Sequence, residues 1–271
     1  MTGFSISWLD LREKADFAAR NKQLLIQALA WLRAGYDALA VNIIVVDLGA
    51  GTGSTLRAMS ALNFSLGVNH ILWRLVDQDG DLLDTALLRH GKTCQIEDYQ
   101  ADLTVIEELP LAGARLVTAS ALFDLVSGDF VDKLVVRIAH HRTGIYAALN
   151  YDGTTTWTPT HPLDKAVLAA FNLDQRCDKG FGLALGPDAT GYLKKILENS
   201  GYTVLVGSSA WLLTAEDHAL VSELISGIAR AVAVGYGLDA DALKDWEIFR
   251  LKHAQLGTCT IGHQDLLALP A

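Results

Sequence analysis

The chain has few cysteines, few prolines and no long apolar run. Three of its 271 residues are cysteine and five are proline. Cys94, Cys177 and Cys259 are far apart and odd in number, which predicts reduced thiols and offers no metal-ligand spacing. No apolar stretch approaches the roughly 18 to 20 residues of a membrane span, and the N-terminus lacks a basic region followed by an apolar core. We therefore expect a cytoplasmic protein with no metal and no membrane partner.

Positive charge is also scarce. The chain carries 22 Lys and Arg against 31 Asp and Glu, a net charge of −9, without a basic cluster. Such a chain is a poor candidate for binding a phosphate backbone, so nucleic acid is not an expected partner. Hydrophobic residues make up 51 % of the sequence, enough for a substantial core. We expect one domain spanning residues 1–271.

The most informative stretch is residues 43 to 54, which read IIVVDLGAGTGS. Its first residues form a short apolar run, typical of a strand buried on both faces of a parallel sheet. Asp47 ends the run, and Gly49, Gly51 and Gly53 follow at alternate positions. Glycine allows positive φ and a close approach of the backbone to a ligand. A dinucleotide fingerprint would place its third glycine at position 54, which is Ser54, so the spacing argues against NAD.

Four further apolar segments, at residues 70–77, 92–99, 114–119 and 144–149, predict strands two to five of repeated β-α units with right-handed crossovers. The second ends in Asp77, 24 residues after Gly53. An acid there accepts hydrogen bonds from ribose hydroxyls in doubly wound folds, and Asp79 can cap the next helix.

Three features resemble class I S-adenosylmethionine (SAM)-dependent methyltransferases of the bacterial stand-alone type. They are the order D-x-G-x-G-x-G from Asp47 to Gly53, the acid Asp77, and the segment Gln100-Ala101-Asp102-Leu103, over about residues 40–150. The resemblance implies an α/β, doubly wound, mostly parallel seven-stranded sheet with helices on both faces, and SAM as the cofactor. It implies that Asp102 receives the adenine amino group. The cofactor-binding residues are then expected to be Asp47, Gly49, Ala50, Gly51, Gly53, Asp77, Gln78, Asp102, Leu103, Ser120, Arg12 and Arg20.

Segments on either side extend the core at 41–150. Residues 1–40 are expected to form a helical cap with one helix over 7–34, and one of its faces carries Trp8, Arg12, Asp16 and Arg20. That face is either solvated, with Asp16 bridging two arginines, or it lies over the cofactor with Arg12 or Arg20 meeting a carboxylate. Residues 201–271 supply strands at 202–206 and 256–261, separated by a helical insertion at 215–253. The insertion either caps the pocket or forms a homodimer surface.

Acceptor binding is expected from the loop after the fourth strand and from residues 151–200. Asp124 either lines the pocket or caps the helix at 130–140. The loop at 174–187 contains four charges and three glycines, and its Arg176 and Lys179 either bind a carboxylate or phosphate or pair within the loop, Arg176 with Asp174 or Asp178. The substrate-binding candidates are Asp124, Tyr151, Asn172, Arg176 and Lys179.

No catalytic residue is marked by an activating partner, although Tyr151 and His161 are candidates for a general base. His263, a lone histidine expected just after the last strand, is interpreted as structural. The predicted function is methyl transfer from SAM to O or N of a small molecule, with an anionic group as one option for that substrate. The alternatives are a protein or RNA methyltransferase, a SAM-binding module without catalysis, and an NAD-dependent oxidoreductase. The loop after the fourth strand lacks the Pro-Pro motif of enzymes that methylate amino groups of nucleic acid.

Overall fold

The computed structural model describes residues 4–34, 42–62 and 71–271. Its central sheet has the strand order β3-β2-β1-β4-β5-β8-β6, and β7 pairs with β8. The strands are β1 Ile43–Leu48, β2 Ile71–Asp77, β3 Gln95–Gln100, β4 Ala114–Ser120, β5 Gly144–Thr158, β6 Tyr202–Ser208, β7 Trp211–Leu213 and β8 Thr258–Pro270. The helices are α1 Ile6–Ala19, α2 Lys22–Ala34, α3 Ser54–Leu62, α4 Gly80–His90, α5 Gly128–His140, α6 Asp164–Asp174, α7 Ala189–Asn199, α8 His218–Val232 and α9 Ala240–His253.

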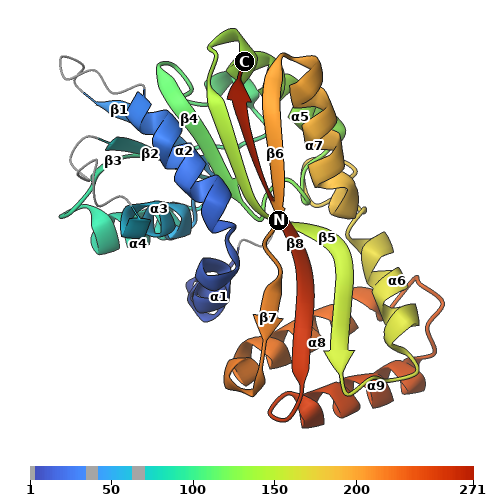
Figure 1. Ribbon diagram of the computed structural model, residues 1–271. Coiled ribbons are helices and arrows are strands. Elements are labelled where there is room, and N and C mark those ends of the chain that lie inside the picture. The colour runs from blue at the N-terminus through green and yellow to red at the C-terminus, as the bar shows by residue number, and fades with distance from the viewer. Residues whose placement is uncertain (1–3, 35–41, 63–70) are drawn as a thin grey trace.

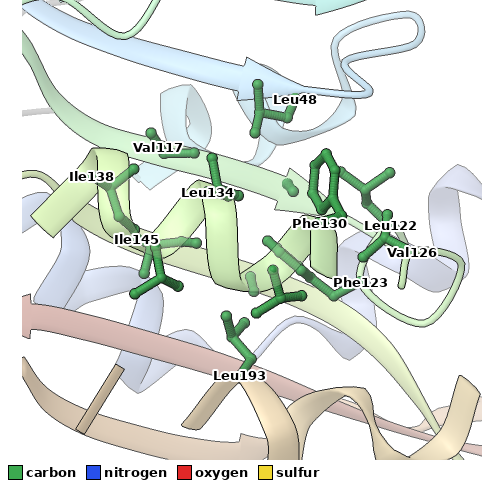
Figure 2. Packing of buried hydrophobic residues seen from close by; sticks show 14 of the residues in the cluster. Leu48, Val117, Leu122, Phe123, Val126, Phe130, Leu134, Ile138, Ile145 and Leu193 are labelled. Carbon is green, nitrogen blue, oxygen red and sulfur yellow. The ribbon is translucent and has the colours of Figure 1, made fainter. Parts of the chain in front are cut away.

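The first five strands are parallel, and β8 lies antiparallel between β5 and β6. Helices cover both faces of the sheet (Figure 1), with α2, α3 and α4 on one face and α5 and α7 on the other. Figure 2 shows Phe130, Leu134 and Ile138 of α5 packed with Leu48 and Val117 of the sheet. The predicted doubly wound, mostly parallel α/β fold is confirmed. It is the fold of class I methyltransferases.

The structure corrects the expected ends of two strands. We expected the fifth strand to end at Leu149, but β5 continues to Thr158 through two register shifts. The last strand, expected at 256–261, is β8 and runs on to Pro270, so His263 and Asp265 lie within it rather than after it. The short strand β7 was not predicted, and it adds an eighth strand to the expected seven.

The continued strands carry a further hydrophobic core, separate from those on the two faces of the central sheet. We call the elements around this core the extension. It comprises the far halves of β5 and β8 together with β7, α6, α8 and α9, which gather at the lower end of the molecule (Figure 1). Trp246, Trp211, Ile225 and Leu243 are buried in it. The predicted helical insertion therefore builds a packed layer of its own on strands shared with the central sheet. No helix in the described part of the chain is long and apolar enough to cross a bilayer.

The N-terminal segment forms two helices, not the single helix expected over 7–34. Arg20 leaves the helical conformation at φ −49° and ψ 136°. The Asn21 main-chain N–H donates to Asp265 Oδ2 of β8 at 2.8 Å, and the Asn21 side chain accepts from Leu24 N–H at 3.2 Å. Asn21 thus starts α2 and ties the break to the sheet, which leaves α1 to run across the glycine loop.

Candidate functional site

A cavity of about 270 Å³ opens at the carboxyl ends of β1, β2 and β4, beneath α1. Ligands of open α/β sheets bind at this edge. The lining combines main chain of the glycine loop, acids after β2, apolar residues after β4 and one loop lysine: Phe4, Leu9, Arg12, Gly49, Gly51, Asp77, Gln78, Asp79, Leu82, Leu103, Ser120, Ala121, Leu122, Leu125, Lys179 and Phe181.

The glycine loop has the backbone conformation that its sequence predicts. Gly49, Gly51 and Gly53 all have positive φ, at 63°, 53° and 85°. A Cβ added to Gly51 would lie 3.1 Å from Leu9 Cδ1 of α1 and would be strained by the left-handed φ. Side chains are thus kept out of the narrow space between the loop and α1.

Asp77 ties the glycine loop to the end of β2. Its Oδ2 accepts from Gly51 N–H at 2.9 Å and its Oδ1 accepts from Asp79 N–H at 3.1 Å. Burial raises the pKa of the Asp77 carboxyl above its usual range. Asp79 caps α4, as predicted, by accepting from Asp81 N–H at 3.0 Å. One carboxylate therefore fixes the loop while it lines the cavity.

The structure brings seven of the twelve predicted cofactor residues to the cavity lining: Gly49, Gly51, Asp77, Gln78, Leu103, Ser120 and Arg12. The other five lie outside the lining formed by the described residues: Asp47, Ala50, Gly53, Asp102 and Arg20.

Two of these five are acids with structural partners. Asp47 is buried behind the loop and accepts from Thr118 Oγ1 at 2.7 Å, and burial raises its pKa to about 6. Asp102 is exposed and accepts from Thr104 N–H and Oγ1, both at 2.8 Å, which lowers its pKa. It makes the turn that brings Leu103 to the cavity.

Arg12 and Arg20 occupy different environments. Arg12 donates twice to Asp16, at 2.9 and 3.2 Å, and lies 5.2 Å from the Trp211 ring centroid. Asp16 is buried and also accepts from Trp211 Nε1–H at 3.0 Å. The α1 face that carries Arg12 and Asp16 is therefore not solvated, and Asp16 pairs with Arg12 and Trp211 rather than with two arginines. Arg20 is buried beside the glycine loop, where its Nη2 donates to Ser120 Oγ at 3.1 Å. Its Nε and Nη1 are buried and have no partner among the described residues, although Arg20 lies outside the cavity lining.

The loop after β4 places Asp124 near the cavity. Ala121 has a φ of +50°, a strained conformation of the kind found at ligand sites. Asp124 is buried, and burial raises its pKa to about 6. It does not cap α5, because Ser127 Oγ accepts from Phe130 N–H in that role.

Of the charged loop residues, only Lys179 reaches the lining. It donates to Asp174 Oδ2 at 2.8 Å. Arg176 pairs with Asp188 at 2.8 Å rather than with Asp174 or Asp178, and it lies outside the cavity.

The two candidates for a general base have other roles. Tyr151 donates from its hydroxyl to Asn172 Oδ1 at 2.9 Å, and burial raises its pKa to about 12. His161 is not brought to the cavity. Its Nδ1 accepts from Leu163 N–H at 3.2 Å, and its ring lies 4.9 Å from that of Phe249 in the extension. We therefore withdraw His161 as a base.

Sequence reasoning missed most of the apolar lining. Leu9, Phe181, Leu122 and Leu125 contribute to the cavity from α1, the loop at 174–187 and the loop after β4. The sequence pointed to Leu122 and Leu125 only by their position, because they follow a strand that ends at the ligand-binding edge of the sheet. Leu9 and Phe181 reach the cavity through tertiary packing.

Comparisons with known proteins agree with this architecture. The sequence matches no protein-family model, and the search of curated proteins found no match. Among solved structures, the YcgJ protein from Bacillus subtilis superposes with a TM-score of 0.50 at 14 % identity, over 93 % of this chain and 100 % of YcgJ. A cyclopropane-fatty-acyl-phospholipid synthase-like protein from Lactobacillus casei gives 0.47 at 14 % identity, over 95 % and 98 %. Phosphoethanolamine N-methyltransferase 2 from Haemonchus contortus gives 0.47 at 17 % identity, over 99 % of this chain and 59 % of that enzyme. At these identities the likeness bears on fold alone.

Proposed function

We propose that the protein is a SAM-dependent methyltransferase acting on a small molecule. One observation supports this proposal: the glycine loop and the Asp77 carboxylate both line an apolar cavity at the carboxyl ends of parallel strands. The glycine spacing supports SAM over NAD. The net charge of −9 argues against RNA as the acceptor.

The residues present fit the cofactor. Gly51 lacks a Cβ where one would meet Leu9, so the main chain is open to close approach. Asp77 can accept from ribose hydroxyls, while Leu82 and Leu103 supply apolar surface for an adenine ring. The unused Nε and Nη1 donors of Arg20 suit the carboxylate of a methionine group.

The cofactor supplies an activated methyl group on a sulfonium. The protein must hold the acceptor in line with the methyl group and keep water out of the site, because in-line displacement depends on both conditions. The roof made by α1 and the apolar loop after β4 provides such an enclosure.

Calorimetry with SAM and with NAD tests the cofactor, and transfer of a labelled methyl group from SAM to a metabolite extract tests catalysis. We expect SAM to bind, NAD not to bind, and a labelled product to form. Binding without a product would leave a SAM-binding module, and a labelled protein or RNA fraction would favour the macromolecular alternative.

Asp77→Ala should weaken SAM binding by about 1 to 3 kcal/mol, because it leaves buried donors unpaired and removes the ribose acceptor. Asp84→Ala on the exposed face of α4 removes the same charge and serves as the control. Isothermal titration of both variants measures the effect, and equal affinities would contradict the ribose role of Asp77.

A further inference from the structure

Asp124 is a buried carboxylate with an unused acceptor. It is 7 % exposed, and its Oδ1 has no hydrogen-bond partner in the part of the chain that the structure describes. By contrast, the buried Asp265 of β8 accepts from Asn21 N–H, Tyr146 O–H and Leu149 N–H at 2.7 to 2.8 Å. Buried charges are ordinarily paired, so Asp124 is in the state expected of a group that meets a ligand.

The position of Asp124 links it to the cavity. It lies between Leu122 and Leu125, which both line the cavity, and its main-chain carbonyl accepts from Gly186 N–H at 2.9 Å. Burial raises the pKa of Asp124, and the nearby charge of Arg12 offsets part of that rise. Burial also raises the pKa of Tyr151, and the charge of Asp124 adds to it, so the carboxylate lies within electrostatic reach of both residues.

The nearby cations are already paired. Arg12 donates both of its forked N–H groups to Asp16, Lys179 pairs with Asp174, and Arg176 pairs with Asp188. An anionic acceptor would therefore meet cations whose charge is already partly balanced by a carboxylate, and it would also face the Asp124 charge. The structure argues against the anionic substrate that the sequence left open.

Three buried aromatic rings lie beside Arg12, outside the cavity lining that the described residues form. The Trp211 ring lies 5.0 Å from the His263 ring, which in turn lies 6.1 Å from the Tyr151 ring. His263 Nδ1 contacts Ile261 O at 3.1 Å, and burial and the Arg12 charge lower its pKa to about 3. The imidazole is thus neutral near pH 7. The faces of Trp and Tyr rings favour a cation over an anion, and the Arg12 guanidinium already lies over the Trp211 ring.

We propose that Asp124 forms an acceptor subsite for a cationic amine beside the cavity, so that the methyl group is transferred to nitrogen. The inference rests on the proposed methyltransferase function and narrows its substrate class. As the nitrogen–carbon bond forms, the carbon–sulfur bond breaks and the sulfur keeps the electron pair. Before this displacement the ammonium group must give one proton to the Asp124 carboxylate, because only the neutral amine has the electron pair that forms the new bond.

The test uses the full chain with methyl-labelled SAM and a small-molecule metabolite extract. Labelled products are first distinguished from unreacted SAM, which is itself a cation, by comparison with a reaction that lacks the protein. They are then passed over a cation exchanger at about pH 3, where amines are charged and carboxylates are largely protonated. We expect the label in the retained fraction. Label in the flow-through would overturn the amine subsite while leaving the methyltransferase intact. A complete absence of labelled product would overturn the proposed function and the subsite with it.

Asp124→Asn then tests the residue on the labelled amine. It keeps the shape of the side chain and removes its charge, and we expect kcat/KM for the amine to fall at least about tenfold with the Kd for SAM unchanged. Asp129→Asn, on the exposed start of α5, is the matched control. Asp124→Glu restores the charge and should recover part of the loss. Wild-type kcat/KM in Asp124→Asn would remove Asp124 from the subsite.

Discussion

Three buried carboxylates near the carboxyl ends of the strands have different partners. Asp47 supports the glycine loop from behind, Asp77 ties the loop to β2, and Asp124 is left with an unused oxygen. Burial raises the pKa of all three, because each is removed from water. Under the proposed function, the same residue type thus serves structure at Asp47, cofactor binding at Asp77 and acceptor binding at Asp124, according to what surrounds each carboxyl group.

Asp47 makes a measurable contribution to the pH dependence of stability. Its pKa is raised from 3.8 to about 6, so the folded state favours the protonated form. The stabilisation is fully present below the unfolded-state pKa and is lost as the pH rises through about 6, a difference of about 3 kcal/mol. Asp47→Asn does not titrate and can keep the hydrogen bond from Thr118.

Urea unfolding of wild type and Asp47→Asn between about pH 4 and about pH 7 checks this expectation. The free energy of unfolding of the variant, relative to wild type, should rise by about 2 kcal/mol over that range, because the unfolded-state carboxyl is already partly ionised at about pH 4. A difference that stays constant with pH would show that Asp47 keeps an ordinary pKa in the folded protein.

At the scale of elements, the site depends on the close approach of α1 to the loop between β1 and α3. The helix break at Asn21 makes this approach possible, and ion pairs from α1 hold it, Glu13 to Arg57 and Asp10 to Arg89. Helix α1, which covers the cavity, is therefore anchored at several points along its length.

Gly51→Ala should disturb this roof. The new Cβ would be strained at a φ of +53° and would lie 3.1 Å from Leu9. Gly201→Ala has a φ of +83° with no neighbour within 4 Å among the described residues, so it reports backbone strain alone. We expect both to lose about 1 kcal/mol or more of stability, and only Gly51→Ala to lose SAM affinity, by at least about tenfold. Titration calorimetry and thermal unfolding separate the two effects, and equal SAM affinities would contradict a close roof.

Short sequence patterns predicted the elements that are formed by residues close together in the chain. The glycine loop, Asp77 and the Asp79 cap could be identified because strand, turn and helix start follow one another in the sequence. The continuation of β5 could not, because Asn150-Tyr151-Asp152-Gly153 has the composition of a turn, and only pairing with β8 keeps it extended. Leu9 and Phe181 were missed for the same physical reason, since distant segments bring them to the cavity.

At the scale of the whole molecule, β5 and β8 belong to two hydrophobic cores. Their near halves pair within the central sheet, at Ile145 with Ala268, and their far halves pair in the extension, at Trp157 with Cys259. Because the same strands carry both cores, we expect the two parts to unfold together.

Trp246→Ala in α9 tests this coupling. Trp246 is buried and donates from Nε1 to Asp164 Oδ1 at 2.9 Å, so its loss should cost about 3 to 5 kcal/mol. Hydrogen exchange should show the same loss of protection in β4 as in α8. Ile248→Ala, half exposed on the same helix, should change little. Loss of protection confined to α8 and α9 would mean that the extension unfolds on its own.

The shared strands also bear on how enzymes of this architecture diversify. Tyr151 and His263 lie on β5 and β8 where these strands pass from the central sheet to the extension. We expect a change in the helices of the extension to shift these strands, and with them Tyr151 and His263, without touching the glycine loop. Selection for a new acceptor can thus act on residues 215–253 while the cofactor end stays constant, and laboratory libraries aimed at new acceptors should begin there.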